Sequence, residues 1–275
     1  MHREKQYPGC IVSKNFFRAA PHIFRKARQI ISVRCGLRRV RVIYSFLLSC
    51  IDTDYETVSI IKKSERGSVA LLRHKQSGAQ FIFRLYRGNA EVYRKLLPIA
   101  CPNLPRILEV AESDGMAAVL EEQVCGDSLA DLLAGACFTP SEAKNITLQL
   151  CNALWALHSI GAVHRDIKPE NVILRGSNAV LIDFDASRLF KDAMSQDTKV
   201  LGTVGYAAPE QYGIAQTDER ADIYSLGVLL NIMLTGRHPS RELAGGKLGA
   251  IVQKCTMVNP RKRYKNVLRL TEALS

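Results

Sequence analysis

The sequence of 275 residues lacks the marks of several protein classes. Its eight cysteines form no Cys-x-x-Cys pair and no cluster with histidine, so neither a zinc site nor a disulfide framework is indicated. The longest apolar stretch near the N-terminus, residues 42–51, is about half as long as a membrane-spanning helix. This stretch also lies too far from Met1 for a signal peptide, and no small-x-small cleavage site follows it. We therefore expect reduced cysteines, a cytoplasmic location and no transmembrane segment.

Acidic residues are almost missing from the first 50 residues. That segment holds 11 Lys and Arg against one acid, Glu4, whereas the rest of the chain holds 27 basic and 25 acidic residues. Most of the formal net charge of +12 thus belongs to this basic leader, residues 1–50. Nonspecific attraction to nucleic acid or to an anionic membrane would explain it, but charge runs are more often solvated surface. We expect no specific nucleic-acid partner, no regular structure in the leader, and a domain that folds without it.

Hydrophobic patterning divides the rest of the chain into two parts. Short apolar runs broken by turn residues predict strands near residues 58–61, 68–72, 80–83, 106–111 and 116–121, with a short helix over 89–97. Helical spacing then predicts a helix that begins at the capping box Thr139-Pro-Ser-Glu142. Further helices are predicted over residues 221–234, 248–257 and 267–274.

A polar segment, His164-Arg-Asp-Ile-Lys-Pro-Glu-Asn171, follows the first of these long helices, and Asp183-Phe-Asp185 comes shortly after it. Phosphoryl transfer requires a carboxylate that orients the acceptor hydroxyl, oxygen ligands for magnesium, and positive charge near the γ-phosphate. Asp166 would orient the hydroxyl and accept its proton, and Lys168 would reach the γ-phosphate. Asn171 and Asp183 would hold Mg²⁺.

These two segments resemble the catalytic loop HRDxKxxN and the magnesium loop of the eukaryotic-type (Hanks-type) serine/threonine protein kinases. The family pattern continues, because Gly202–Glu210 is similar to GTxxYxxPE, Asp222–Gly227 to DxxSLG and Asn259–Arg263 to DPxxR. The resemblance implies that Thr203 contacts the catalytic loop, that Asp222 braces its backbone, and that Arg263 pairs with Glu210.

The resemblance also implies the fold and the activity. It covers about residues 57–274 and implies an α+β, two-lobed kinase domain over residues 55–274, with a small β-rich lobe at 55–122 and a larger helical lobe at 125–274. The implied activity is transfer of phosphate from ATP, with Mg²⁺, to serine or threonine of protein substrates. Arg165 would pair with a phosphate on Ser195 or Thr198. Two alternatives stay open, a pseudokinase and a small-molecule phosphotransferase of the aminoglycoside or choline kinase type.

The small lobe departs from the family pattern. Of the glycine loop GxGxxGxV only Gly67 and Val69 remain, and Lys62 or Lys63 could share the phosphate contact. Arg84 stands where the family has its phosphate-binding lysine, with Glu91 as its expected ion-pair partner. The hinge that meets adenine is expected at Glu122 to Val124. The nucleotide-binding residues implied by the resemblance are therefore Gly67, Val69, Arg84, Glu91, Glu122, Val124, Asn171 and Asp183. Asp185, where the family has glycine, would restrain the magnesium loop or hold a metal-bound water.

Overall fold

The computed structural model describes residues 36–189, 203, 205–212 and 217–275. Its contacts divide the chain into two compact units. Unit 1 consists of Met1–Ala90 and Ile107–Gln123, and unit 2 consists of Glu91–Arg106 and Val124–Ser275. Among the helices in the described part of the chain, none combines the length and the hydrophobicity that a bilayer crossing requires.

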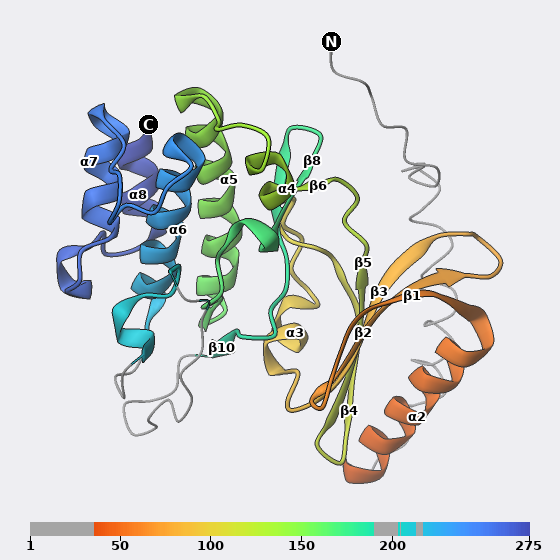
Figure 1. Cartoon of the computed structure of the whole chain (residues 1–275). Coiled ribbons are helices and arrows are strands. Elements are labelled where there is room, and N and C mark those ends of the chain that lie inside the picture. The colour runs from red at the N-terminus through yellow and green to blue at the C-terminus, as the bar shows by residue number, and fades with distance from the viewer. Residues whose placement is uncertain (1–35, 190–202, 204, 213–216) are drawn as a thin grey trace. The chain divides into compact units, whose positions relative to one another are not determined.

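Unit 1 is built on a five-stranded antiparallel sheet with the order β1-β2-β3-β5-β4 (Figure 1). Its strands confirm the five that the sequence predicts, and they are β1 (Tyr55–Ser64), β2 (Gly67–His74), β3 (Gln80–Arg87), β4 (Ile107–Ser113) and β5 (Met116–Glu122). Gly67 has a φ of 155°, and a Cβ atom there would collide with the carbonyl oxygen of Leu85. The one glycine that remains from the family loop is thus required for the close approach of β2 to β3.

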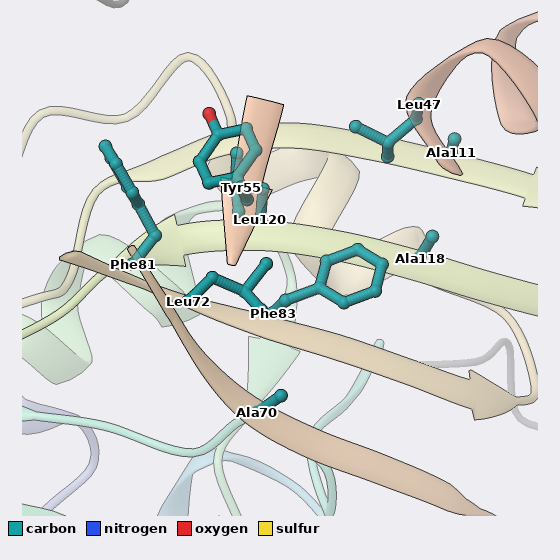
Figure 2. Packing of buried hydrophobic residues seen from close by; sticks show 9 residues of the cluster. All are labelled: Leu47, Tyr55, Ala70, Leu72, Phe81, Phe83, Ala111, Ala118 and Leu120. Carbon is teal, nitrogen blue, oxygen red and sulfur yellow. The ribbon is translucent and has the colours of Figure 1, made fainter. Parts of the chain in front are cut away.

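Helix α2 (Gly36–Asp54) packs against one face of this sheet (Figure 1). Leu47 is only 3% exposed and belongs to the same core cluster as Phe81 and Phe83 of β3 (Figure 2). The other members of the cluster are Tyr55, Ala70, Leu72, Ala111, Ala118 and Leu120. Lys75 closes the end of the helix, because its Nζ donates to the carbonyl oxygens of Thr53 at 2.7 Å and Asp52 at 3.3 Å.

This helix corrects the expectation that residues 36–50 have no regular structure. Ile43, Leu47, Leu48 and Ile51 recur at helical spacing, and all four contact the core of unit 1. This apolar stripe is short and comes directly after a run of arginines. The high positive charge of the segment made its helical periodicity difficult to recognise in the sequence. Residues 1–35 of the expected leader lie outside the described residues.

Unit 2 is mainly helical and confirms the predicted long helices. These are α5 (Pro140–Ser159), α6 (Glu219–Thr235), α7 (Gly246–Cys255) and α8 (Val267–Leu274) (Figure 1). Thr139 and Glu142 form the predicted capping box of α5. The short helix α4 (Leu129–Leu133) was not expected from the sequence. Helix α3 (Glu91–Leu96) confirms the short helix predicted over residues 89–97, and its residues are grouped with unit 2.

Short strands and turns in unit 2 carry the polar segment. One small sheet has the order β6 (Asp127–Ser128), β8 (Val172–Arg175) and β9 (Asn178–Leu181), and β7 (Ala162–Val163) pairs with β10 (Arg188–Leu189). Three 3-10 turns complete the unit, η1 (Pro169–Asn171), η2 (Pro209–Tyr212) and η3 (Pro260–Lys262). Residues 164–168 therefore run between β7 and η1, and Asp183 follows β9 with one residue, Ile182, between them.

Candidate active site

A buried carboxylate, Asp222 near the start of α6, fixes the backbone of the loop that holds the candidate catalytic residues. Its Oδ2 accepts a hydrogen bond from the His164 N–H at 2.9 Å, and its Oδ1 accepts one from the Arg165 N–H at 2.8 Å. His158 of α5 also lies against it, with Nε2 at 2.8 Å from Oδ2. Although burial opposes ionisation, these bonds and the neighbouring histidines lower the pKa of Asp222. The bracing role implied by the family resemblance is confirmed.

Two residues of the site adopt a backbone conformation that is uncommon outside glycine. Arg165 has a φ of 70° and Asp183 a φ of 68°. Such positions cost roughly 1–3 kcal/mol and persist only where surrounding contacts enforce them. Arg165 is held from both sides, because Asp222 accepts from its N–H and Gln211 Nε2 donates to its carbonyl oxygen at 2.9 Å. Because both backbone groups of Arg165 are held in this way, the backbone that leads into the adjacent Asp166 is held as well.

Asp166, Lys168 and Thr203 form a closed set of contacts. Thr203 Oγ1 donates to Asp166 Oδ1 at 2.7 Å, and Lys168 Nζ lies 2.9 Å from Asp166 Oδ2. Lys168 Nζ also donates to Thr203 Oγ1 at 2.8 Å. The contact of Thr203 with the catalytic loop, implied by the resemblance, is therefore observed. A partly buried carboxylate stands beside a cation, as a hydroxyl-orienting group in phosphoryl transfer requires.

The electrostatic surroundings keep Asp166 ionised. Burial of this carboxyl raises its pKa, but the hydrogen bonds from Thr203 and Lys168 and the charge of Lys168 outweigh that effect, so the pKa of Asp166 is lowered. Full burial lowers the pKa of His164, which is neutral for that reason. Its Nδ1 accepts from the Asp166 N–H at 3.3 Å, so the ring proton is on Nε2, which contacts the carbonyl oxygen of Ile182 at 3.2 Å.

Asn171 and Asp183 supply oxygen ligands suited to a magnesium ion. Asn171 Nδ2 donates to the Asp166 carbonyl oxygen at 2.8 Å and to Asp166 Oδ2 at 3.0 Å, which turns the amide oxygen away from that carboxylate. The Ile182 N–H donates to the Asn171 carbonyl oxygen at 2.9 Å and so ties the loop to the residue before Asp183. Within the described residues no group of three or more His, Cys, Asp or Glu is arranged as a metal site. One carboxylate, from Asp183, and one amide oxygen, from Asn171, fit Mg²⁺, because this ion commonly takes one or two carboxylates and substrate phosphates.

Asp185, which stands in the place of the family's glycine, contacts helix α3. The hydroxyl of Tyr93 donates to Asp185 Oδ1 at 3.3 Å, and the Tyr93 ring meets Phe184 edge-on with 5.7 Å between centroids. Phe184 in turn packs edge-on against His164. Residues 183–185 therefore contact both α3 and the catalytic loop. Such contacts would restrain the conformation of this segment. No motif in the sequence pointed to Tyr93.

In unit 1, Arg84 forms a buried ion pair with Glu121. Arg84 Nε lies 2.7 Å from Glu121 Oε1, and the two side chains are only 8% and 4% exposed. The register explains the pair, since Arg84 lies opposite Val119 and Glu121 is two residues further along β5, on the same face of the sheet. Val69 of β2 lies opposite Arg84 on its other side. The sequence analysis missed Glu121, although an arginine in an apolar strand requires a buried acid nearby.

The remaining predicted nucleotide-binding residues lie at the ends of elements. Glu122 is the last residue of β5, and Val124 is the first residue of the second segment of unit 2. Glu91 is the first residue of α3, and its side chain is exposed. Because Glu91 and Arg84 belong to different units, their pairing stays a prediction. The hinge role of Glu122 and Val124 also stays a prediction. Ser195 and Thr198 lie outside the described residues.

The Glu210–Arg263 pair stabilises the segment after Thr203. Arg263 Nη1 lies 2.6 Å from Glu210 Oε1, and Nη2 donates to Oε2 at 2.8 Å, so the contact is bidentate. The same guanidinium donates to the carbonyl oxygens of Arg220, Met257 and Val258. This pairing, implied by the resemblance, is confirmed.

Comparison with known proteins identifies the family. The model of the protein kinase domain matches residues 54–271. The chain belongs to the protein kinase domain family. The two-lobed α+β class expected from the sequence is thereby confirmed, and the match begins at the last residue of α2.

Curated relatives are bacterial kinases. The kinase domain is 40% identical over 164 residues to "Serine/threonine-protein kinase pkn2" of Myxococcus xanthus, covering 55% of this chain and 20% of the relative. It is 36% identical over 135 residues to "Probable serine/threonine-protein kinase PknB" of Corynebacterium glutamicum, covering 46% and 21%. A match of 30% over 200 residues to "Serine/threonine-protein kinase PknB" of Mycobacterium leprae covers 62% and 32%. The chain thus spans a fifth to a third of the length of these relatives.

Proposed function

We propose that this kinase domain transfers the γ-phosphate of ATP to serine or threonine hydroxyls of protein substrates. The observation that carries the proposal is the contact set of Asp166, Lys168 and Thr203, in which an ionised carboxylate is fixed beside a cation. The names of its relatives support the choice of serine and threonine as acceptors. A small-molecule phosphotransferase is disfavoured, because enzymes of that class usually lack a segment like Gly202–Glu210. Here Thr203 contacts the catalytic loop and Glu210 pairs with Arg263.

Each residue of the set has one task. Asp166 Oδ2 or Oδ1 orients the acceptor hydroxyl and takes its proton while the oxygen–phosphorus bond forms and the bond to the leaving oxygen of ADP breaks. Lys168 offsets the negative charge on the phosphoryl oxygens. Asn171 and Asp183 would hold Mg²⁺, which would offset the negative charge of the phosphate groups.

Arg84 is the cation that unit 1 contributes in this proposal. Its guanidinium is planar and always charged, and Glu121 orients it through the 2.7 Å bond to Nε. A planar guanidinium cannot simply replace a lysine ammonium, so we expect turnover to depend on how Glu121 orients it. Use of Mg²⁺ in particular and a cytoplasmic location remain predictions from the sequence.

The experiment is a transfer assay on the full chain. Purified protein is incubated with γ-labelled ATP, Mg²⁺ and a mixture of acidic and basic carrier proteins, followed by phosphoamino-acid analysis. We expect label on phosphoserine or phosphothreonine, lost when Mg²⁺ is chelated and restored when it is returned. Absence of transfer, with ATP binding retained in a thermal-shift assay, would support the pseudokinase alternative. Label on an added aminoglycoside or choline but on no protein would support the small-molecule alternative.

A further inference from the structure

A hollow of about 490 Å³ lies within unit 2, beside the segment that contacts Asp166. Its lining residues include Tyr206, Ile232, Arg237, His238, Ser240 and Arg241, which we call the basic pocket. Three of these six side chains are basic, and none of the described residues that line the hollow is acidic. A hollow of this size, with several convergent polar groups, has the properties of a ligand site.

The basic pocket rests on a rigid support. Asn231 of α6 is fully buried, and its Nδ2 donates to the carbonyl oxygens of Arg237 at 2.8 Å and Glu242 at 2.7 Å. Its Oδ1 accepts from the Ala244 N–H at 2.9 Å. One buried amide therefore fixes the loop that carries both arginines. A preorganised binding site requires supporting hydrogen bonds of this kind behind the residues that contact the ligand.

Arg237, His238 and Arg241 each present N–H donors in the pocket. His238 Nδ1 accepts from the Ser240 N–H at 3.1 Å and lies 2.7 Å from Ser240 Oγ, so in the neutral ring the proton is on Nε2. Arg237 pairs with Glu242 at 3.2 Å, but both side chains are largely exposed, so this pair is weak. Arg241 has no ion-pair partner in the part of the chain that the structure describes. An anionic group is the ligand that these donors would bind.

The pocket is close to the candidate catalytic carboxylate. Thr203 Oγ1 donates to Asp166, and the N–H groups of Tyr206 and Ala207 both donate to the Thr203 carbonyl oxygen at 3.0 Å. Tyr206, in the pocket wall, is therefore one turn away from the residue that contacts Asp166. An extended peptide covers about 3.3–3.6 Å per residue, so a substrate whose hydroxyl lies at Asp166 would reach the pocket within about four residues.

We propose that the basic pocket binds an anionic side chain of the protein substrate, located within about four residues of the phosphorylated hydroxyl. The inference rests on the proposed function and names its substrate class, acidic segments of proteins. The ligand chemistry is shared by the carboxylates of Asp and Glu and by phosphoserine. Exposed ion pairs contribute little each, so we expect selectivity of about three- to tenfold rather than an absolute requirement.

The test uses the full chain and a peptide series with one acceptor serine or threonine. Each position from four residues before to four residues after it is occupied in turn by Ala, Glu, phosphoserine or Lys. We expect one or two positions at which Glu raises kcat/KM about three- to tenfold over Ala and Lys lowers it. The phosphoserine arm shows whether phosphate or carboxylate is the better ligand. The preference should weaken as salt is raised, because exposed charges are screened.

Variants assign the preference to the pocket. Arg241→Gln should reduce the Glu-to-Ala ratio of kcat/KM to near one, and Arg241→Glu should invert it in favour of Lys. Glu242→Gln removes the competing carboxylate and should raise the ratio. Arg269→Gln is the control, since Arg269 is, like Arg241, an exposed arginine of unit 2 but does not line the pocket. Its ratio should equal that of the unchanged protein.

Equal rates for Glu, Ala and Lys at every position would overturn the inference, as would a preference that persists in Arg241→Gln. If no peptide is phosphorylated, the proposed function fails, and a binding assay decides the inference separately. Fluorescence anisotropy with a labelled peptide that carries Ala at the acceptor position should then show tighter binding of the Glu peptide, lost in Arg241→Gln. Equal binding of the Glu and Ala peptides would contradict the pocket assignment.

Discussion

Arg84 Nε and Glu121 Oε1 lie 2.7 Å apart inside unit 1, with both side chains buried. The pair lies on the face of the sheet opposite to the one that α2 covers, because side chains alternate along β3 between Phe83, in the core, and Arg84. A buried carboxylate therefore orients the arginine that stands where the family resemblance places a phosphate-binding lysine. Two consequences follow, one for stability and one for turnover.

Removing the charge of Glu121 should destabilise unit 1. Glu121→Gln leaves a buried guanidinium without this carboxylate, and breaking a buried ion pair costs about 3–5 kcal/mol. The double change Arg84→Met with Glu121→Leu should restore most of the loss, since apolar replacements of buried pairs are often neutral. Urea denaturation measures both. The control is Glu56→Gln in the same sheet, whose pair with Arg73 is about half exposed, and which should change the free energy of unfolding by less than about 1 kcal/mol.

Turnover should depend on the charge of Arg84. Loss of a preorganised cation costs several kcal/mol of transition-state stabilisation, so Arg84→Ala should lower kcat/KM at least about a hundredfold. Arg84→Lys should leave substantial activity or raise it. Equal rates in all three proteins would mean that Lys62 or Lys63 supplies the charge instead.

Helix α2 should be necessary for stability. Leu47→Ala removes a buried side chain and leaves a cavity, which costs about 2–5 kcal/mol. A chain shortened to begin at Tyr55 should lose at least as much. Ser45→Ala, on the exposed side of the same helix, is the matched control and should have almost no effect. An unchanged melting temperature in the shortened chain would show that the packing of α2 on the sheet does not stabilise unit 1.

The hydroxyl of Thr203 should set the acid limit of activity. It donates to the carboxylate of Asp166 and so lowers the pKa of that group. In Thr203→Val the donor is lost, the pKa of Asp166 rises, and the ionised form disappears at a higher pH than before. The acid limb of the profile of kcat/KM against pH should therefore move upward, whereas Thr203→Ser should keep it in place. A limb that does not move in Thr203→Val would exclude Asp166 as the titrating group.

Much of this architecture could be predicted from the sequence because the determinants are local. Short apolar runs broken by turn residues predicted the strands, and the capping box at Thr139 predicted the start of α5. The family resemblance implied the contacts of Thr203, Asp222 and Arg263. Prediction failed where the determinant is tertiary. Glu121 becomes the partner of Arg84 only through the register of β3 with β5. The apolar stripe of α2 is buried only because the sheet lies against it, and the sequence of the helix does not show that contact.

The most direct test of the account is a single-turnover measurement with Asp166→Asn. This change keeps the size of the side chain but removes its ability to accept the proton of the acceptor hydroxyl. We predict that phosphotransfer falls at least about a hundredfold, the effect of losing a positioned general base, while Mg-ATP affinity stays within about threefold. Asp218→Asn is the isosteric control, because asparagine caps α6 as well as aspartate does. Transfer by Asp166→Asn at the rate of the unchanged protein would contradict the central role of Asp166.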